Sequence, residues 1–393
     1  EEEIAHLKGA FDHVTFVPEN RMGTLLPLPG GFEVDESFAS LLASNRVNGL
    51  LQTVFVPALY SDILNRPSIL IHPAMLMRLV NFVRKAILTR VWIDDWLTAH
   101  DSNGDQFVFY TYWFDYAAMG IGLAKRKYSN IRLISRAHGY DLYEERHAYN
   151  YWPCRRTAIS MLDRLCLDSK AGLDYITDRY PEFRSKYETA FLGVKRAGFV
   201  ASQSMDHTFR IVSCSRLVPV KRVDLILDGI ARLAQLLPNV DLEWHHFGNG
   251  DTRSDLQDRA NSVLPPSARA FFPGYSDQSE LFRFYEENPV DVFINASQSE
   301  GTPVAIMEAI SCGIPVIATS VGGNVEIVNS RNGLLLSPNP SPDEIAMAFL
   351  EIQSQPGLAR EKRVESVRMW NEKYNAEKNF GEFAHLLRNL HSS

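Results

Sequence analysis

The sequence has few cysteines, no long apolar run and no excess of basic residues. Its 393 residues include four cysteines (Cys154, Cys166, Cys214 and Cys312), and none stands in a CxxC pair or at metal-ligand spacing. This predicts reduced, buried thiols rather than a disulfide framework or a metal site. The formal net charge of −7 leaves no basic surplus to neutralise a phosphate backbone, so no nucleic-acid partner is expected.

No run of 18 apolar residues occurs and no signal peptide is visible, which predicts a cytoplasmic protein without a membrane span. The chain opens with Glu-Glu-Glu-Ile-Ala-His-Leu, which has the pattern of the middle of an amphipathic helix. We therefore expect a first strand and its loop to precede Glu1 in the natural protein. The length allows two domains of ordinary size, and there is no solenoid repeat.

The second half of the chain alternates short apolar runs with helical patterns. Runs of strand length lie at Phe209–Ser215, Asp241–Phe247, Arg269–Gly274, Asp291–Ala296 and Pro315–Thr319. Helical patterns lie at Val223–Leu236, Thr252–Leu264, Gln278–Glu287 and in a run that begins at Val304. This alternation predicts βαβ units with right-handed crossovers, and therefore a doubly wound α/β domain with a parallel sheet.

The first half follows the same α/β pattern less regularly. Its strand candidates are His13–Val17, Val54–Pro57, Phe107–Thr111, Ile131–Ser135, Arg164–Leu167 and Thr189–Leu192. Its helix candidates are Ala74–Leu97, Tyr116–Lys127 and Lys170–Asp178. The small, polar stretch Gly198–His207 is typical of a linker between domains. The tail Pro356–Leu390 is predicted to be mostly helical, with Trp370 and Tyr374 as anchors.

A single carboxylate stands in an apolar helical run. Glu308 is the only charged residue from Val304 to Cys312. Burying a carboxylate is costly unless a polar group meets it, so we favour a ligand-binding role for Glu308. A buried salt bridge to an arginine is the alternative.

The residues before this run have the pattern of a helix start. Thr302 is a good N-cap, and Pro303 suits the first helical position. The free amides near Gly301 and Thr302 and the positive end of the helix dipole then form a site for phosphate. Glu300 stands in the same loop, eight positions before Glu308. This arrangement favours a ligand with hydroxyls and a diphosphate, as in a nucleotide sugar.

Three more loops follow predicted strands, at the edge where open parallel sheets bind ligands. Arg216 and Lys221 suit a diphosphate, although a solvated basic turn has the same pattern. Gly248 and Gly250 allow the backbone to approach a ligand closely, or form an ordinary tight turn. His138 ends a strand in the first half, where a structural role and a catalytic one are equally open.

These loops form a set of motifs that resembles a known family. The motifs are HGxD at His138–Asp141, SRL…K at Ser215–Lys221, GxG at Gly248–Gly250, a carboxylate pair at Glu300 and Glu308, a CGxPVIAT-type strand at Cys312–Thr319 and GGxxE at Gly322–Glu326. In this combination the chain resembles the retaining group-1 (family 4) glycosyltransferases of the glycogen-synthase and sucrose-synthase superfamily. The resemblance is strong over residues 209–340 and looser around His138.

The resemblance implies a glycosyltransferase-B fold, an α/β architecture of two Rossmann-like domains that face each other across a cleft. The N-terminal, acceptor-side domain would span residues 1–198 and the C-terminal, nucleotide-sugar domain 199–372. A final helix, 373–393, would cross back to the first domain. The family carries a glycine-rich loop after its first strand, and no such loop precedes Glu1. We expect an incomplete chain rather than a disabled enzyme.

The resemblance also implies roles for the motif residues. Arg216 and Lys221 would hold the donor diphosphate and stabilise its charge as it leaves. Glu308 would accept hydrogen bonds from the ribose hydroxyls. Glu300 would contact the transferred sugar, and His138 would reach one of its hydroxyls across the cleft. Other positions would line the donor with backbone atoms: Gly248, Gly250, Gly301, Thr302 and Pro303.

The predicted activity is transfer of a sugar, with retained anomeric configuration, from a UDP-sugar or GDP-sugar to a glycan or a polyprenyl- or lipid-linked acceptor. The expected setting is bacterial surface polysaccharide or glycolipid synthesis. No cofactor is predicted, and cationic side chains at the diphosphate predict that no metal is required. Asp101–Asp105 resembles a cation loop, but its glycine is misplaced and we predict a polar turn.

Two other functions stay open. One is a nucleotide-sugar epimerase or hydrolase of the same fold. The other is a catalytically silent subunit that only binds a sugar nucleotide or a partner. The joint presence of His138, Glu300 and Glu308 argues against silence, because a binding module needs no paired carboxylates.

The acceptor side of the sequence allows two interpretations. Pro73–Trp92 is apolar and basic, and such a helix would either lie peripherally on anionic lipid headgroups or form a core helix with a solvated face, which we favour. The aromatic residues of Tyr110–Phe114 would stack on sugars or fill a core.

Overall fold

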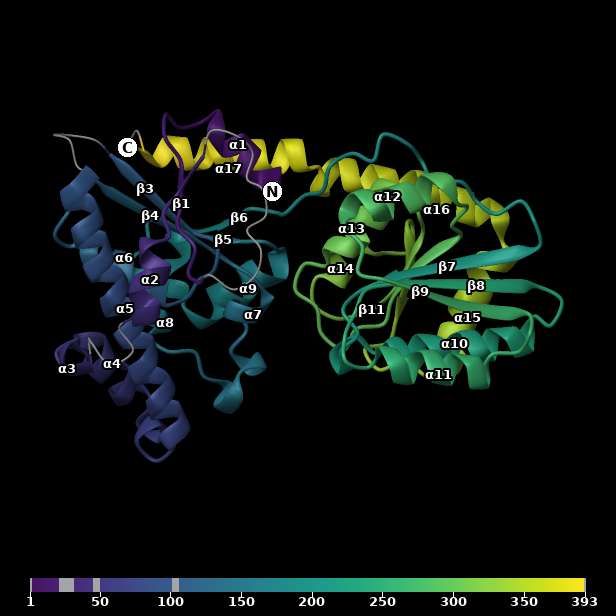
Figure 1. Cartoon of the computed structure of the whole chain (residues 1–393), viewed down its shortest axis with the longest axis horizontal. Coiled ribbons are helices and arrows are strands. Elements are labelled where there is room, and N and C mark those ends of the chain that lie inside the picture. The colour runs from purple at the N-terminus through teal and green to yellow at the C-terminus, as the bar shows by residue number, and fades with distance from the viewer. Residues whose placement is uncertain (1, 21–31, 45–49, 101–105, 392–393) are drawn as a thin grey trace. The chain divides into compact units, whose positions relative to one another are not determined.

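The computed structural model describes residues 2–20, 32–44, 50–100 and 106–391. The chain divides into two compact units (Figure 1): one comprises Glu1–Phe191 and Phe380–Ser393, and the other Leu192–Asn379. Helix α17 (Ala376–His391) begins in the second unit, and from Phe380 on it belongs to the first. The loop predicted at Asp101–Asp105 lies outside the described residues.

The second unit is built on a parallel sheet in the strand order β12-β11-β10-β7-β8-β9. The strands are β7 (Thr208–Cys214), β8 (Asp241–Phe247), β9 (Ala268–Gly274), β10 (Val292–Asn295), β11 (Val316–Thr319) and β12 (Gly333–Leu336). The helices are α10 (Val223–Leu236), α11 (Arg253–Val263), α12 (Gln278–Glu287), α13 (Val304–Ser311), α14 (Asn324–Ile327), α15 (Pro342–Ser354) and α16 (Pro356–Met369).

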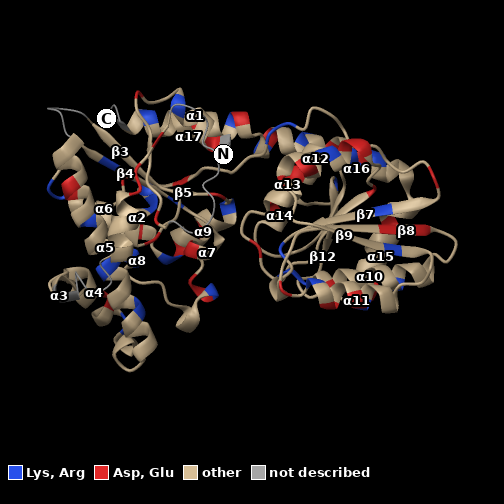
Figure 2. Ribbon diagram, viewed as in Figure 1, with Lys and Arg blue, Asp and Glu red and all other residues tan. Residues whose placement is uncertain are grey.

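Helices cover both faces of this sheet. In Figure 1, α10, α11 and α15 lie on one face and α12, α13 and α16 on the other. Because no face is left to solvent, the central strands β10 and β11 are buried along their whole length. Figure 2 shows the charges of this unit mainly on its helices and at the starts of β7 and β8.

The direction of the strand order reverses between β7 and β10. From β7 the chain builds β8 and β9 on one side, and β10, β11 and β12 on the other. The two strands are parallel neighbours, with Val292 opposite Ile211 and Phe293 opposite Val212. The loops after them lead to helices on opposite faces of the sheet. Such a switch point is where open α/β sheets bind their ligands.

The first unit contains a smaller parallel sheet in the order β3-β4-β5-β6, and a separate pair of strands, β1 and β2. Its strands are β1 (Thr15–Phe16), β2 (Glu33–Val34), β3 (Phe107–Thr111), β4 (Ile131–Ala137), β5 (Arg164–Leu167) and β6 (Tyr187–Thr189). Its helices before α17 are α1 (Glu2–Lys8), α2 (Ser37–Ser44), α3 (Leu50–Thr53), α4 (Pro57–Asn65), α5 (Pro73–His100), α6 (Tyr116–Lys125), α7 (Gly139–Leu142), α8 (Arg155–Met161) and α9 (Lys170–Arg179).

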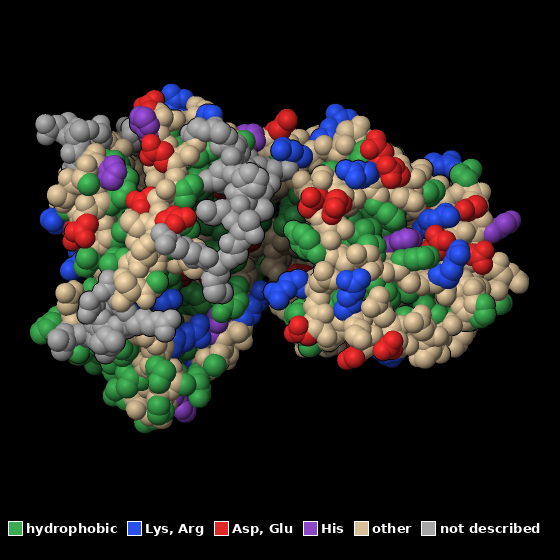
Figure 3. Space-filling model, in the orientation of Figure 1, with side chains coloured by type: hydrophobic (Ala, Val, Ile, Leu, Met, Phe, Trp, Pro, Cys, Tyr) green, Lys and Arg blue, Asp and Glu red, His purple; other side chains and the backbone are tan. Residues whose placement is uncertain are grey.

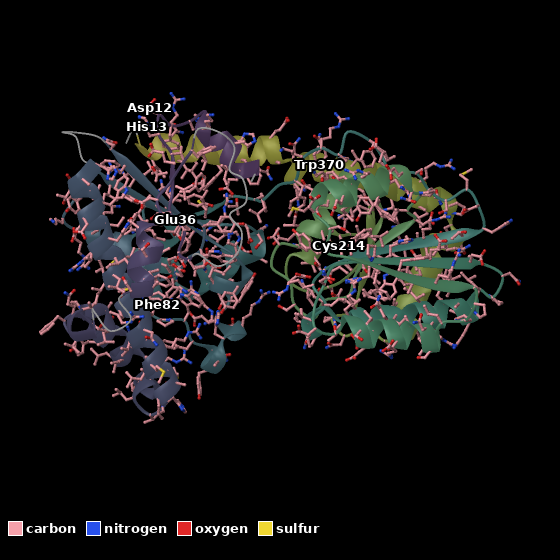
Figure 4. All side chains as sticks on the ribbon, viewed as in Figure 1. Asp12, His13, Glu36, Phe82, Cys214 and Trp370 are labelled. Carbon is pink, nitrogen blue, oxygen red and sulfur yellow. The ribbon has the colours of Figure 1, made fainter. Side chains whose placement is uncertain are left out.

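The core of this unit lies along α5, which packs against α6. Phe82 is one of the buried α5 side chains (Figure 4). Gly120 allows the two helices to touch, because a Cβ atom there would lie 2.5 Å from the carbonyl oxygen of Ala86. The predicted core role of Pro73–Trp92 is therefore confirmed over the middle of α5. No helix in the described ranges is both long and apolar enough to cross a membrane.

Most predicted strands and helices are confirmed, and β3, β5, β8, α10 and α12 have the predicted bounds. The strand predicted at Val54–Pro57 is wrong, because α3 ends at Thr53 and α4 begins at Pro57. Periodicity cannot distinguish a strand from a helix in such a short apolar run. Proline suits a helix start, because the amide of the first helical residue has no partner within the helix. The strand predicted at Thr189–Leu192 lies earlier, at Tyr187–Thr189.

The two predicted anchors of the tail are buried. A π-helical turn, Trp370–Tyr374, joins α16 to α17. The indole of Trp370 (Figure 4) donates a hydrogen bond of 3.0 Å to the carbonyl of Val194. This bond and the burial of Tyr374 fix the start of α17 to the second unit.

Candidate active site

The loops that follow β7 and β10 meet at the switch point of the second unit. After β7 the chain turns through the exposed Arg216 to Lys221. The ammonium of Lys221 donates to Oε1 of Glu300 over 2.6 Å, and the amide of Gln298 donates to the carbonyl of Val220 over 2.8 Å. The predicted cationic turn and the predicted carboxylate loop are therefore brought to one place.

The carboxylate of Glu300 is held by donors from its own loop as well. Oε1 also accepts from the side-chain amide nitrogen (Nδ2) of Asn295 at 3.0 Å and from the hydroxyl of Ser297 at 2.5 Å. Both partners are buried. The sequence analysis missed Asn295 and Ser297, although small polar residues at the end of a buried strand are a usable signal. These bonds and the Lys221 ammonium hold the Glu300 carboxylate in a fixed position.

Arg222, which the sequence analysis also missed, fastens the same loops. Its guanidinium donates to the carbonyls of Ala296 at 2.7 Å, Ser297 at 2.9 Å and Pro338 at 2.8 Å. Burial lowers the pKa of Arg222 from its ordinary value. The planar guanidinium suits several carbonyl acceptors in fixed directions, which a lysine ammonium does not. In the sequence, the signal that could have indicated Arg222 was its position directly after Lys221.

Helix α13 begins one residue later than predicted. Pro303, not Thr302, is the N-cap, and its side chain makes no capping hydrogen bond. Pro303 has ψ of 99°, so it is still extended, and its carbonyl accepts from Ile306 at 3.1 Å. Proline restricts φ but not ψ, so Pro303 can keep an extended ψ and stand just outside the helix. By helix geometry the first amides, from Val304 on, point back toward the loop of Glu300.

The GGxxE loop supports the Glu300 loop from the other side through close backbone contact. Gly322 has φ of +47°, and a Cβ atom there would lie 2.0 Å from the carbonyl oxygen of Glu300. A Cβ on Gly323 would lie 2.2 Å from the carbonyl oxygen of Gly301, to which the Gly323 amide donates over 2.9 Å. Only glycine fits at these two positions.

The GxG loop has the same relation to the cationic turn. A Cβ atom on Gly248 would lie 1.9 Å from the carbonyl oxygen of Ser215, and one on Gly250 would lie 2.1 Å from that of Leu217. The Leu217 amide donates to the Asn249 carbonyl over 3.0 Å. These contacts explain both glycines through backbone packing beside Arg216. Contact of the GxG loop with a ligand stays a prediction.

Glu308 is buried on α13 and is met by a neutral side chain. The amide of Gln278, the first residue of α12, donates to its Oε1 over 3.0 Å. Burial raises the pKa of the thiols of Cys214 (Figure 4) and Cys312 to about 12, and the charge of Glu308 adds to the effect. Gln278 places the start of α12 next to the carboxylate that is predicted to hold a ribose.

His138 lies at the carboxyl end of β4 in the first unit. Its Nδ1 lies 3.1 Å from Oδ2 of Asp168, while its Nε2 is buried and makes no hydrogen bond to any described residue. The rings of Tyr112 and Trp113 lie 4.5 Å and 4.9 Å from the imidazole. Since Asp168 engages Nδ1, Nε2 is the atom available to a ligand. Asp168 was not predicted.

Asp141 of the HGxD motif shapes the backbone around His138. Its carboxylate accepts from the amide of His138 at 2.6 Å and from that of Phe114 at 2.5 Å. Burial raises the pKa of Asp141, although both amides oppose the shift. This residue thus joins the loop after β3 to the start of α7.

Comparison with known proteins agrees with this geometry. A family model of group 1 glycosyl transferases matches residues 198–370, which contain the switch-point loops. This part of the chain is similar to the group 1 glycosyl transferases. The matched region holds all the predicted site residues except His138.

Curated proteins that match this part of the chain are longer proteins. The GtfA subunit of a UDP-N-acetylglucosamine–peptide N-acetylglucosaminyltransferase from Streptococcus agalactiae is 29% identical over 153 residues, which cover 36% of this chain and 28% of the relative. Probable sucrose-phosphate synthase 3 from Arabidopsis thaliana is 30% identical over 173 residues, which cover 40% of this chain and 16% of the relative. The matches thus span less than a third of these relatives.

Solved structures share the fold over 77% of the chain. The lipopolysaccharide outer core galactosyltransferase WaaB in its apo form has a TM-score of 0.61 at 17% identity, over 77% of this chain and 80% of that one. HepE from Anabaena in complex with UDP-glucose has a TM-score of 0.58 at 17% identity, over 77% and 82%. Both are GT-B glycosyltransferases, so the predicted α/β fold class is confirmed.

The described residues contain no group of three or more His, Cys, Asp or Glu side chains placed to hold a metal ion. The prediction that the reaction needs no metal stays a prediction.

Proposed function

We propose that the chain is a retaining hexosyltransferase that moves a sugar from a nucleoside-diphosphate sugar to a hydroxyl of a glycan or lipid-linked acceptor. The observation that carries the proposal is the Lys221–Glu300 pair of 2.6 Å at the switch point, beside the amide end of α13 and the buried Glu308. A diphosphate needs positive groups, and a sugar or ribose needs acceptors. This site offers both within two loops and one helix.

The cationic groups suit the departure of the diphosphate. When the bond between the anomeric carbon and the diphosphate oxygen breaks, negative charge grows on that oxygen. Lys221, Arg216 and the first amides of α13 would stabilise this charge and lower the barrier. The acceptor hydroxyl forms the new bond to the anomeric carbon, and its proton leaves with the diphosphate. The HepE complex with UDP-glucose supports a UDP-sugar donor, with a GDP-sugar as the alternative.

The carboxylates suit the hydroxyls of the donor. Glu308 would accept hydrogen bonds from the ribose, with Gln278 fixing the plane of its carboxylate. Glu300 would contact the transferred sugar while Asn295 and Ser297 hold it in place. His138 would bond a sugar hydroxyl through Nε2, because Asp168 engages Nδ1. We keep synthesis of a surface polysaccharide or glycolipid as the proposed setting.

Thermal unfolding of the full chain with UDP, GDP, ADP and CDP tests the proposal. A ligand that binds only the folded state raises the melting temperature, and the donor carrying the best nucleotide is then assayed for slow hydrolysis. We expect UDP or GDP to give the largest rise and Lys221→Ala or Glu308→Ala to remove it. Lys127→Ala, at an exposed ion pair, is the matched control and should keep it.

Two results would contradict the proposal. One is that none of these nucleotides raises the melting temperature of the unaltered chain. The other is that the Lys221→Ala/Glu308→Ala double variant hydrolyses the donor at the full rate.

A further inference from the structure

One end of the first unit exposes large apolar side chains on α4, on the turns before and after it, and at the start of α5. We call this surface the apolar tip, and its members are Phe55, Tyr60, Leu64, Leu70, Ile71 and Met77. Phe55 is 81% exposed, Leu64 79%, Ile71 74% and Met77 65%. Figure 3 shows hydrophobic side chains gathered there. Monomeric proteins rarely leave so contiguous an apolar surface in water without a use for it.

The tip is not an unfinished part of the core. Each segment that carries it already buries its other face: Ala58 and Leu59 on α4, Ile69 in the turn, and Met75 and Leu79 on α5. A groove of about 600 Å³ beside α4 is lined by residues that include Phe55, Tyr60 and Leu64. The exposed residues therefore form a second, outward apolar surface.

The segment that carries the tip is predominantly basic. From Val54 to Arg90 the only acidic residue is Asp62, and its carboxylate accepts from the Tyr151 hydroxyl at 2.8 Å and the Cys154 amide at 2.7 Å. The same stretch holds several cations: Arg66, Arg78, Arg84, Lys85 and Arg90. Arg84 follows Met77 by seven residues on α5, so both lie on the same side of the helix. A negatively charged surface would complement this region.

Amphipathic aromatic residues lie at the edge of the tip. Tyr149 is 49% exposed and stacks with His72 at 4.9 Å between ring centres. The Arg66 guanidinium donates to the carbonyls of Tyr149 at 2.6 Å and Asn150 at 2.9 Å. An apolar surface with an amphipathic tyrosine and basic residues beside it is typical of a contact with the interface of a membrane.

We propose that the apolar tip docks the chain on an anionic lipid surface. Phe55, Leu64, Ile71 and Met77 enter the boundary between headgroups and acyl chains, and the cations of α5 attract the negative headgroups. The contact surface therefore includes α4 and the turn before α5, which the sequence did not indicate, and excludes the buried middle of α5. The inference is independent of the proposed sugar transfer, although a lipid-linked acceptor would lie in the same membrane.

Sedimentation of the full chain with vesicles tests the proposal. Vesicles of phosphatidylcholine mixed with phosphatidylglycerol are compared with vesicles of phosphatidylcholine alone, at low and high salt. We expect binding to the mixed vesicles only, weakened by salt because the attraction of the cations is screened. Leu64→Glu and Ile71→Glu should each lower the partition constant by about tenfold or more, as one apolar side chain loses its burial.

Met205→Glu is the matched control, because Met205 is a 94% exposed apolar residue in the second unit. This variant should bind vesicles like the unaltered chain. Circular dichroism and nucleotide-induced thermal shifts without vesicles, which none of these variants should alter, separate docking from folding and from the proposed transferase site. The proposal is overturned if the unaltered chain ignores the mixed vesicles, binds neutral ones equally well, or binds unchanged with Leu64→Glu and Ile71→Glu combined. The first of these results would leave a protein partner as the occupant of the tip.

Discussion

The Nζ atom of Lys221 lies 2.6 Å from Oε1 of Glu300, and this ion pair joins loops that are 79 residues apart in the sequence. The side chains are 23% and 8% exposed. Because both charges are largely removed from water, each depends on the other for stabilisation. The pair brings the cation proposed for the diphosphate next to the carboxylate proposed for the sugar.

Removing one member of the pair should affect stability and activity differently from removing both. Lys221→Ala leaves the Glu300 carboxylate without its cation, and we expect the free energy of unfolding to fall by about 1–3 kcal/mol. Adding Glu300→Gln should restore most of this loss, since the buried charge is gone, while donor hydrolysis stays abolished. Urea denaturation measures the first effect, and a double variant as unstable as Lys221→Ala would contradict it.

Gly322→Ala should disturb the Glu300 loop through the backbone. The new Cβ would meet the Glu300 carbonyl oxygen at 2.0 Å, at a residue with φ of +47°. We expect a loss of about 2 kcal/mol in the free energy of unfolding, with loss of donor hydrolysis. Gly357→Ala is the control, because nothing lies within 4 Å of its Cβ position. Equal stability of the two variants in urea would show that the close approach is not maintained in solution.

Gln278 should act as a positioning residue for Glu308. Gln278→Leu removes the 3.0 Å hydrogen bond to the carboxylate, and we expect about tenfold weaker nucleotide binding, as for loss of one bond to a charged group. Isothermal titration with the nucleotide that gives the largest thermal shift measures this change. Gln235→Leu, on the exposed face of α10, should leave binding unchanged. Rescue by Gln278→Asn would distinguish positioning from a general structural role.

His246 should make the second unit less stable in acid. Burial lowers its pKa from 6.5 to about 4. Between these values the unfolded chain binds a proton that the folded one does not, so the free energy of unfolding falls as the pH drops from 6.5 toward 4. The full effect is about 3 kcal/mol.

Urea denaturation at a series of pH values measures this slope. His246→Gln should flatten it, and His207→Gln, at an exposed position, should not. A slope that is the same in His246→Gln as in the unaltered chain would mean that other groups set the acid sensitivity.

The sequence predicted the second unit well because each of its βα units is local. The run Val223–Leu236 and the strand Asp241–Phe247 each carry their own pattern, and the structure reproduces both. The run Val54–Pro57 was assigned wrongly because four residues do not distinguish a strand from a helix boundary. The cap at Thr302 was wrong because ψ of a proline cannot be inferred from its identity.

Long-range partners in the site could not be predicted. Asp168 comes 30 residues after His138, and only the pairing of β4 with β5 brings the two together. Gln278 reaches Glu308 from another helix in the same way. Periodicity shows which residues are buried or follow a strand. It does not show which neighbours a parallel sheet will create.

The close contacts of Gly248 and Gly250 with the carbonyls of Ser215 and Leu217 mean that main-chain atoms, rather than side chains, fix the shape of the turns that are proposed to hold the diphosphate. Exposed residues on these turns, such as Asn249, can then be substituted without changing the backbone. For the proposed donor site, we therefore expect single substitutions on these turns to change donor preference without moving the backbone, which makes the turns the natural place to redesign which sugar nucleotide is accepted.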